Sequence, residues 1–255
     1  MKRFSNVGGG GILELTLQGF RGCQKNSICY NSDMKHHYVK TKGFTLAEVL
    51  VTLGIIGVVS AMTVPTLMQN YQRKSYVTQL HKVYNELQQG LLQFQTDNNA
   101  INYREAGINS QEEAEAFFEK YFKVVKKCND NSCIGDSYTN MRGLSIGVDR
   151  PIYYVLANGA SVGFAYADRS TNFLLMLYVD VNGKKGPNIA GRDMFAVYVY
   201  NNGYIDDETV SGTGMPPFSK EEREKAFEEK CNDATAANWY GCFGKILNDN
   251  WEMTY

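Results

Sequence analysis

The sequence lacks an excess of charge of either sign, which already narrows what the protein can be. Its 26 Lys and Arg residues nearly balance 27 Asp and Glu residues, for a formal net charge of −1. The chain lacks the basic excess that would indicate a nucleic-acid partner. It also lacks the acidic excess that would indicate a disordered chain. Apolar residues make up 44% of the chain, as in globular proteins. We therefore predict a folded protein and no nucleic-acid partner.

Familiar catalytic and metal-binding patterns are also missing. The sequence contains no P-loop, no HExxH and no GxGxxG motif, and its six cysteines form no CxxC pair. Histidine is scarce, with three residues in all, and His81 is the only one that follows the first 37 residues. We therefore expect a protein that is not an enzyme.

What is present is a long run without charged side chains, from Val49 to Gln72. It has 24 residues, or about 36 Å of helix. Its most apolar part, Val49 to Met68, matches the ~20 residues that cross a bilayer core. Lys35, Lys40 and Lys42 precede the run, which keeps the N-terminal side in the cytoplasm. We expect a single-pass segment with the following polypeptide outside the cytoplasm.

The helix does not end with the apolar run. Residues after Gln72 keep a helical spacing of apolar side chains with polar residues between them: Tyr76, Leu80, Val83, Tyr84, Leu87, Leu91 and Phe94. This pattern predicts one continuous helix from about Phe44 to about Thr96, apolar all round in its first half and amphipathic in its second.

Three ordinary interpretations compete for the apolar segment. A buried helix of a soluble protein conflicts with its length and basic flank. A secretory signal peptide would use the small residues Val59-Ser60-Ala61, but Pro65 and more apolar residues follow that point. A plain membrane anchor explains everything except Glu48. A carboxylate at the bilayer centre costs about 2.5–3.5 kcal/mol, less near the edge, and tends to mark function.

The residues around Glu48 resemble a known processing site. The stretch Lys42-Gly43-Phe44-Thr45-Leu46-Ala47-Glu48-Val49-Leu50 is similar to the prepilin cleavage site of type IV pilins and type II secretion pseudopilins. The resemblance implies that a membrane prepilin peptidase cuts after Gly43 and methylates the new amine of Phe44. Pro65 lies where many members of the family have a proline that kinks the helix.

Cleavage would give Glu48 a chemical partner. It creates a cationic amine on Phe44, one helical turn away. In the apolar core of a fibre a paired charge is tolerated, whereas an unpaired one is costly. The spacing allows the pair to form within one chain or between two chains. The resemblance implies the second, in which Glu48 and Phe44 join adjacent subunits during assembly.

The processing site divides the chain into four parts. Residues 1–43 are a leader that is removed, residues 44–68 are the transmembrane half of the helix, and residues 69–98 are its amphipathic half. Residues 99–255 form an exported globular domain. A short basic leader begins at Met34, and we expect translation to start there.

The exported part is predicted to contain helices and a sheet. Gln111 to Lys126 has an amphipathic pattern with Ser110 as its cap, and Ser219 to Lys230 is a charged surface helix. An antiparallel meander of four to five strands is expected, with strands at Leu144–Val148, Ile152–Ala157, Ser161–Ala167, Phe173–Val181 and Met194–Tyr200 and turns at Asn158-Gly159 and Asn202-Gly203. The fold class is α+β. The resemblance implies a pilin-like architecture, in which the long N-terminal spine helix packs on a small antiparallel sheet.

The best candidate site in the body is the loop between the last two long strands. Four side chains in it offer the hard oxygen ligands that calcium takes: Asp180, Asn182, Asn188 and Asp193. No acidic residue closes the loop at the EF-hand spacing, and three basic residues in it oppose a cation. The resemblance favours calcium, because major secretion pseudopilins hold calcium in a sheet-edge loop. The alternative is a rigid turn held by Asn and Asp side chains. We expect no cofactor to be required.

The cysteines are expected to form disulfides if the body is exported. Cys23 and Cys29 lie in the leader, so four cysteines remain and three connectivities are open. We favour the two local pairs, Cys128 with Cys133 and Cys231 with Cys242.

These observations predict a pilin-like subunit, a pseudopilin or minor pilin, assembled through its N-terminal helix into a type II secretion pseudopilus or a type IV pilus. Its expected partners are prepilin peptidase, other pilin or pseudopilin subunits, the inner-membrane assembly platform and the membrane. We expect it in the bacterial inner membrane, with its C-terminal domain in the periplasm or an extracellular fibre. The alternative is a binding module, tethered to the membrane or at a fibre tip, that contacts a surface, a secreted substrate or DNA.

Overall fold

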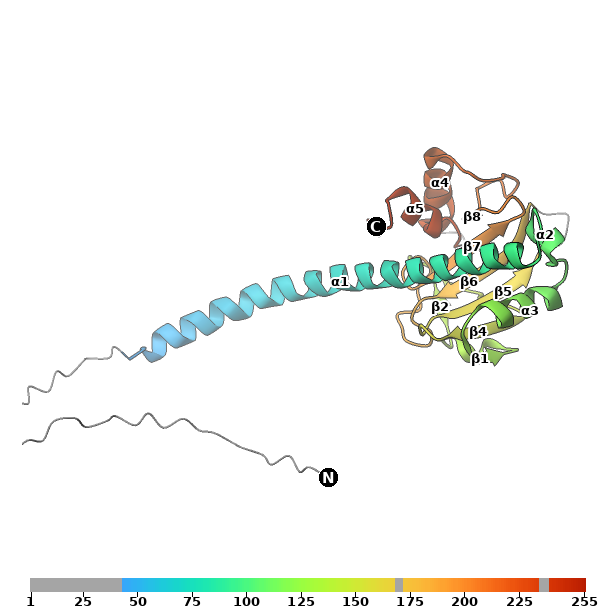
Figure 1. The fold of residues 1–255 in the computed structure, drawn as a ribbon. Helices are drawn as coiled ribbons and strands as arrows, with labels where there is room; N and C mark the ends of the chain where they lie inside the picture. Colours follow the sequence, from blue (N-terminus) through green and yellow to red (C-terminus); the bar gives the residue numbers. More distant parts are fainter. Residues whose placement is uncertain (1–42, 168–171, 234–238) are drawn as a thin grey trace, which may run out of the picture. The chain divides into compact units, whose positions relative to one another are not determined.

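A computed structural model describes residues 43–167, 172–233 and 239–255 of the chain (Figure 1). The expected leader up to residue 42, with the start at Met34 and the pair Cys23 and Cys29, lies outside the described residues. The chain divides into two units, residues 1–52 and 53–255.

The first helix, α1, begins at Leu46 and ends at Asp97, which confirms the predicted helix to within two residues at each end. Pro65 lies inside it. All residues from 43 to 72 are exposed, including the large apolar side chains. The helix is long and apolar enough to cross a membrane by length and composition. Leaving so many apolar side chains in water would be unfavourable, so this half requires an apolar environment.

The second half of α1 packs on the sheet (Figure 1). Its buried face confirms the predicted spacing and consists of Val77, Leu80, Val83, Leu87, Gly90, Leu91 and Phe94. Tyr76 and Tyr84 are partly buried against the same core. Polar residues occupy the opposite face, so this half is amphipathic as predicted.

The main sheet is antiparallel and has six strands in the order β1-β4-β5-β6-β7-β8, two of which the sequence did not indicate. The predicted central strands are present as β4 (Ile152–Leu156), β5 (Ser161–Tyr166), β6 (Phe173–Asp180) and β7 (Met194–Tyr200). The additional edge strands are β1 (Val124–Cys128) and β8 (Ile205–Asp206). The strand expected at Leu144–Val148 shrinks to β3 (Ser145–Ile146), which pairs with β2 (Tyr138–Thr139) in a separate small sheet.

The helix expected over Gln111–Lys126 is wrong at its C-terminal end. Helix α3 spans Gln111–Tyr121, and Phe122 is already extended with φ −112° and ψ 149°. The next residues form β1, whose two β-branched valines favour a strand. Val125 is 71% exposed, so it never belonged to the apolar face of the helix. The predicted cap is confirmed, because the Ser110 side chain accepts from the backbone N–H of Glu113.

The sheet has two buried faces, and the period of two along each strand separates them. In β7, Phe195, Val197 and Val199 join the core beneath α1, whereas Ala196 and Tyr198 join a second core on the opposite face. Most of the large side chains of this second core are tyrosines. Their hydroxyl groups need partners when buried. Tyr200, for example, donates to the carbonyl of Asp207 at 2.8 Å.

Short helices complete the fold. The four-residue helix α2 (Tyr103–Ala106) follows α1. Helix α4 (Lys220–Ala226) begins with a capping box between Ser219 and Glu222, and continues as a π-helical turn over Phe227–Cys231. Helix α5 (Cys242–Asn248) packs against α4 and β7. The predicted charged helix is thus present, although Ala226 and Phe227 are buried rather than solvated.

Candidate functional site

The start of α1 places Glu48 in a local hydrogen-bond pair. One carboxylate oxygen of Glu48 accepts from the backbone N–H of Thr45 at 2.8 Å and from its hydroxyl at 2.9 Å. The Thr45 hydroxyl in turn accepts from the backbone N–H of Glu48 at 3.2 Å. This arrangement is a capping box, which satisfies donors that the helix itself leaves free. The Glu48 carboxylate therefore points back toward Thr45, the residue that follows Phe44.

The oxygen-rich loop joins β6 to β7 and brings its two acids together. Asp180 pairs with Met194 in the sheet, and Asp193 immediately precedes that residue. The carboxylate of Asp193 accepts from the backbone N–H groups of Asn188 at 2.8 Å and Ile189 at 2.7 Å. Asp180 accepts from the backbone N–H of Asn182 at 3.1 Å and from the hydroxyl of Tyr138. Hydrogen bonds between the two acids and backbone N–H groups of the same loop therefore hold part of its conformation.

Both acids are fully buried, which changes their protonation. Burial, together with the nearby Asp193 carboxylate, raises the pKa of Asp180 to about 7, although the hydrogen bond from Tyr138 opposes the shift. Burial likewise raises the pKa of Asp193, although the backbone N–H groups that it accepts oppose the shift. Two buried carboxylates that lie close together repel each other, so protonation of one acid or binding of a cation is favourable.

The amide groups of the loop have unused oxygens. The Oδ1 atoms of Asn182 and Asn188 are buried and have no hydrogen-bond partner. Lys184 and Lys185 are exposed to solvent, so their charges are screened from the buried acids. The four predicted residues are therefore close in the fold, and the chemistry of their oxygen donors fits a hard cation. Among the described residues, no group of three or more His, Cys, Asp or Glu side chains could hold a metal, so a site here would need the amide oxygens beside the two carboxylates.

Both local disulfides that the sequence favours are present. Cys128 is bonded to Cys133 between the end of β1 and a short turn, and Cys231 is bonded to Cys242 at the start of α5. The second bond lies against the oxygen-rich loop: a Cβ atom on Gly191 would come within 2.8 Å of the Cys242 sulfur. Gly191 also has a φ of +84°, so no other residue suits this contact.

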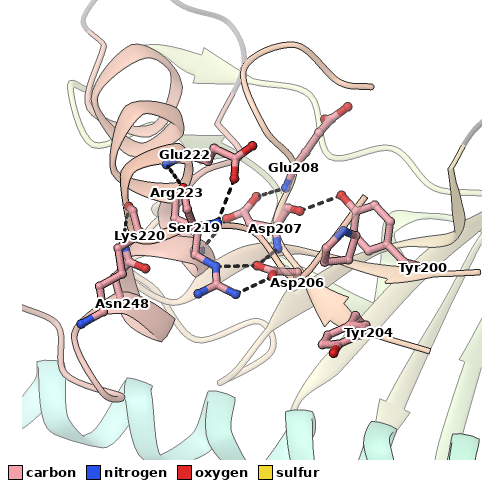
Figure 2. A network of polar contacts seen from close by, with 12 residues as sticks. Tyr200, Tyr204, Asp206, Asp207, Glu208, Ser219, Lys220, Glu222, Arg223 and Asn248 are labelled. Atoms are coloured by element: carbon pink, nitrogen blue, oxygen red, sulfur yellow. Dashed lines mark hydrogen bonds and ion pairs between the residues drawn. The ribbon is translucent and has the colours of Figure 1, made fainter. Parts of the chain in front are cut away.

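A polar network that the sequence analysis did not single out follows β8 (Figure 2). The guanidinium of Arg223 binds both oxygens of Asp206, at 3.0 and 2.5 Å. Asp207 is buried and accepts from the backbone N–H groups of Gly241 and Gly244, both at 2.8 Å. The network therefore ties β8 to α4 and α5. Its partners are 17 to 37 residues apart in the sequence, so no local pattern indicated it.

The sequence contains one hydrolase-like pattern that was missed among the catalytic motifs above, and the structure gives it a different role. Gly159 to Gly163 matches G-x-S-x-G, which places a nucleophilic serine on a strand-to-helix turn in α/β-hydrolases. Here Ser161 is the first residue of β5, is buried, and donates to the carbonyl of Cys133 at 2.7 Å. His81, the one histidine among the described residues, stacks on Trp251 instead. In the part of the chain that the structure describes, the Ser161 hydroxyl thus serves as a donor to the backbone.

The methylation motif and the body of the chain match different known families. A family of unknown function, DUF6613, matches residues 66–255, which is most of the chain. The chain belongs to this family. The prokaryotic N-terminal methylation motif matches residues 39–64 and so includes Gly43, Phe44 and Glu48. The two matches of the DUF6613 chain adjoin within α1.

A curated relative matches over a shorter region. The type II secretion system core protein G of Pectobacterium carotovorum subsp. carotovorum is 29% identical over 93 residues. The match covers 36% of the DUF6613 chain and 55% of that protein, so the chain spans about half the length of this relative. No solved structure matches the chain.

The motif, the apolar helix and the sheet beneath it together make the DUF6613 chain a pilin-like protein with a membrane-anchoring helix. Proteins of the pilin class are structural rather than catalytic.

Proposed function

We propose that the DUF6613 chain is a precursor of a fibre subunit. Prepilin peptidase cuts it after Gly43 and methylates the amine of Phe44 in the bacterial inner membrane. The mature subunit then assembles through α1, with other pilin-like subunits and an inner-membrane platform, into a type II secretion pseudopilus or a type IV pilus. The globular part lies in the periplasm or along the fibre.

One observation carries this proposal. Glu48 is the only charged side chain between Phe44 and Gln72, and it stands at the start of an otherwise apolar helix surface that is exposed along its whole length. Packing such helices together buries their side chains, and each new Phe44 amine would then need a negative partner. Glu48 supplies one carboxylate per subunit, which leaves the bundled core neutral.

The capping box offers a purely local role for the same carboxylate, and one pair of variants separates the two roles. Glu48→Gln removes the charge from the bundle. Thr45→Val removes the hydroxyl hydrogen bonds but keeps the carboxylate, and the loss of a cap costs only about 1 kcal/mol. We expect Glu48→Gln to be inserted and cleaved normally but to be lost from sheared fibres by about 100-fold or more, because breaking a buried pair costs about 3–5 kcal/mol.

The measurement is immunoblotting of membrane and sheared-fibre fractions from the source cells, with the mass of the mature chain as the check on cleavage. Thr45→Val should still form fibres. If Thr45→Val is lost from fibres as fully as Glu48→Gln, or if Glu48→Gln assembles normally, Glu48 acts only as a helix cap and the assembly role is wrong.

We also propose that the loop between β6 and β7 holds calcium. The ligands would be the carboxylates of Asp180 and Asp193 and the amide oxygens of Asn182 and Asn188. The support is the pair of buried acids with the two unpaired amide oxygens in the same loop. A bound Ca²⁺ would balance the charge of the two buried acids and hold the loop against the disulfide beside it.

Thermal unfolding of the full chain in nonionic detergent tests this site. After treatment with a chelator, calcium should raise the melting temperature more than the same concentration of magnesium, because Mg²⁺ needs a stricter octahedral site. Asp193→Asn should lose the response, and Asp136→Asn, which changes an exposed acid, should keep it. The same melting temperature with and without calcium would leave a rigid turn as the role of the loop.

A further inference from the structure

A groove lies where the C-terminal segment meets α1, just beyond the apolar run. It has a volume of about 570 Å³ and is lined on one side by Arg73, Lys74 and His81 of α1. Trp251 and Met253 form part of the other side. The Trp251 ring stacks on His81 with ring centres 4.0 Å apart, which closes the end of the groove farther along α1.

The two cations at the near end lack partners. The Nε atom of Arg73 is buried and has no hydrogen bond, although a guanidinium nitrogen in such a place normally finds an acceptor. Within the described part of the chain, neither Arg73 nor Lys74 forms an ion pair. The groove has one acid, Glu252, whose side chain is exposed at its rim. The site is therefore built to receive a negative group from outside the chain.

The position of the cations along the helix indicates which negative group this is. Arg73 follows Met68, the end of the strongly apolar run, by five residues, or about 7.5 Å of helix. The headgroup layer on each side of a bilayer is roughly 5–8 Å thick. Arg73 and Lys74 thus lie at the depth of the lipid phosphates. They are also on the side of the membrane where the positive-inside rule disfavours cations, so topology does not explain them.

We infer that this groove binds the phosphate of an anionic phospholipid headgroup while the subunit is in the membrane. Arg73 and Lys74 hold the phosphate, and the groove between them and Trp251 receives the rest of the headgroup. The inference rests on the membrane orientation in the proposed function. The bound lipid would set the height of α1 in the bilayer and be released when the subunit leaves for the fibre.

Native mass spectrometry of the delipidated full chain in detergent micelles measures this binding directly. Phosphatidylglycerol and phosphatidylcholine are added separately, and the bound fraction of each is compared. We expect preferential binding of phosphatidylglycerol. The affinity should fall roughly fivefold for each cation removed in Arg73→Gln and Lys74→Gln. Lys82→Gln removes an exposed lysine of the same helix that does not line the groove, and should change nothing.

Further arms distinguish the sources of the negative group. Lys74 is exposed, so Lys74→Gln tests the site without disturbing the fold, and Glu252→Gln should strengthen binding rather than weaken it. Equal binding of the two lipids, or equal effects of Lys74→Gln and Lys82→Gln, would overturn the inference. Displacement of the lipid by inorganic phosphate at matched ionic strength would also overturn the inference. The formation of dimers that need Arg73 but no lipid would overturn it as well. None of these readouts depends on cleavage or fibre formation, so they are separate from the tests of Glu48.

Discussion

At the scale of single residues, the adjacent buried acids Asp206 and Asp207 are stabilised by different partners. Asp206 faces Arg223, whose guanidinium binds both of its oxygens and balances its charge. Asp207 accepts backbone N–H groups instead, and burial raises its pKa to about 7. At a pH between the ordinary pKa of 3.8 and the raised pKa of about 7, Asp207 is protonated in the folded chain and ionised in the unfolded one.

This difference predicts how stability depends on pH. The pKa of Asp207 is higher in the folded chain than its ordinary value of 3.8, so the folded chain binds the proton more tightly. The stabilisation is complete below pH 4 and is lost as the pH rises through about 7. We expect the melting temperature of the full chain in detergent to fall over this interval, and Asp207→Asn to flatten the fall.

Asp136→Asn is the matched control, because Asp136 is exposed. It should leave the pH dependence as it is. A fall of the same steepness in Asp207→Asn and in the unaltered protein would mean that Asp207 is ionised in the folded state as well.

The residues that could be predicted at this scale are those whose partners are close in the sequence. Asp180 and Asp193 were predicted together because one loop carries both. Tyr138, which donates to Asp180 from 42 residues away, gave no local signal. The capping role of Glu48 could have been found, because a threonine three residues before a glutamate at a helix start is the pattern of a capping box.

At the scale of elements, the long central strands were predictable and the edge strands were not. β6 and β7 are long, and apolar or aromatic residues fill both of their faces because each face carries a core. β8 has only two residues, too few for any period. β1 was assigned to the preceding helix, since its valines continue an apolar pattern that tertiary pairing with β4 overrides.

The two disulfides should differ in what they contribute, because they close loops of different length. The Cys231–Cys242 bond spans 11 residues and the Cys128–Cys133 bond spans 5. In the chain-entropy description they stabilise the fold by about 3 and about 2 kcal/mol. We expect replacement of Cys231 and Cys242 by serine to lower the melting temperature more than the same replacement of Cys128 and Cys133.

We would compare the melting temperatures of the two double-serine variants in detergent at one protein concentration. Each variant is then the matched control for the other. A larger loss from the Cys128 and Cys133 variant would contradict the loop-length argument. It would then follow that the short bond supports the start of the sheet more than the longer bond supports α5.

At the scale of the whole molecule, one helix serves two environments. Its first half exposes apolar side chains that only lipid or neighbouring helices can cover, and its second half is the spine beneath which the sheet packs. The boundary between the two matched families, at residues 64 and 66, lies between these halves. This division was readable from hydropathy, whereas the C-terminal helices and their network depend on contacts that only the fold creates.

The central claim is that cleavage after Gly43 creates a charged amine on Phe44 and that Glu48 pairs with this amine. The most direct measurement is the intact mass and N-terminal sequence of the protein purified from membranes of its own cells. Our account predicts a mature chain that begins with N-methylated Phe44. A population that retains Lys42 and Gly43 throughout, with no trimmed form, would contradict it.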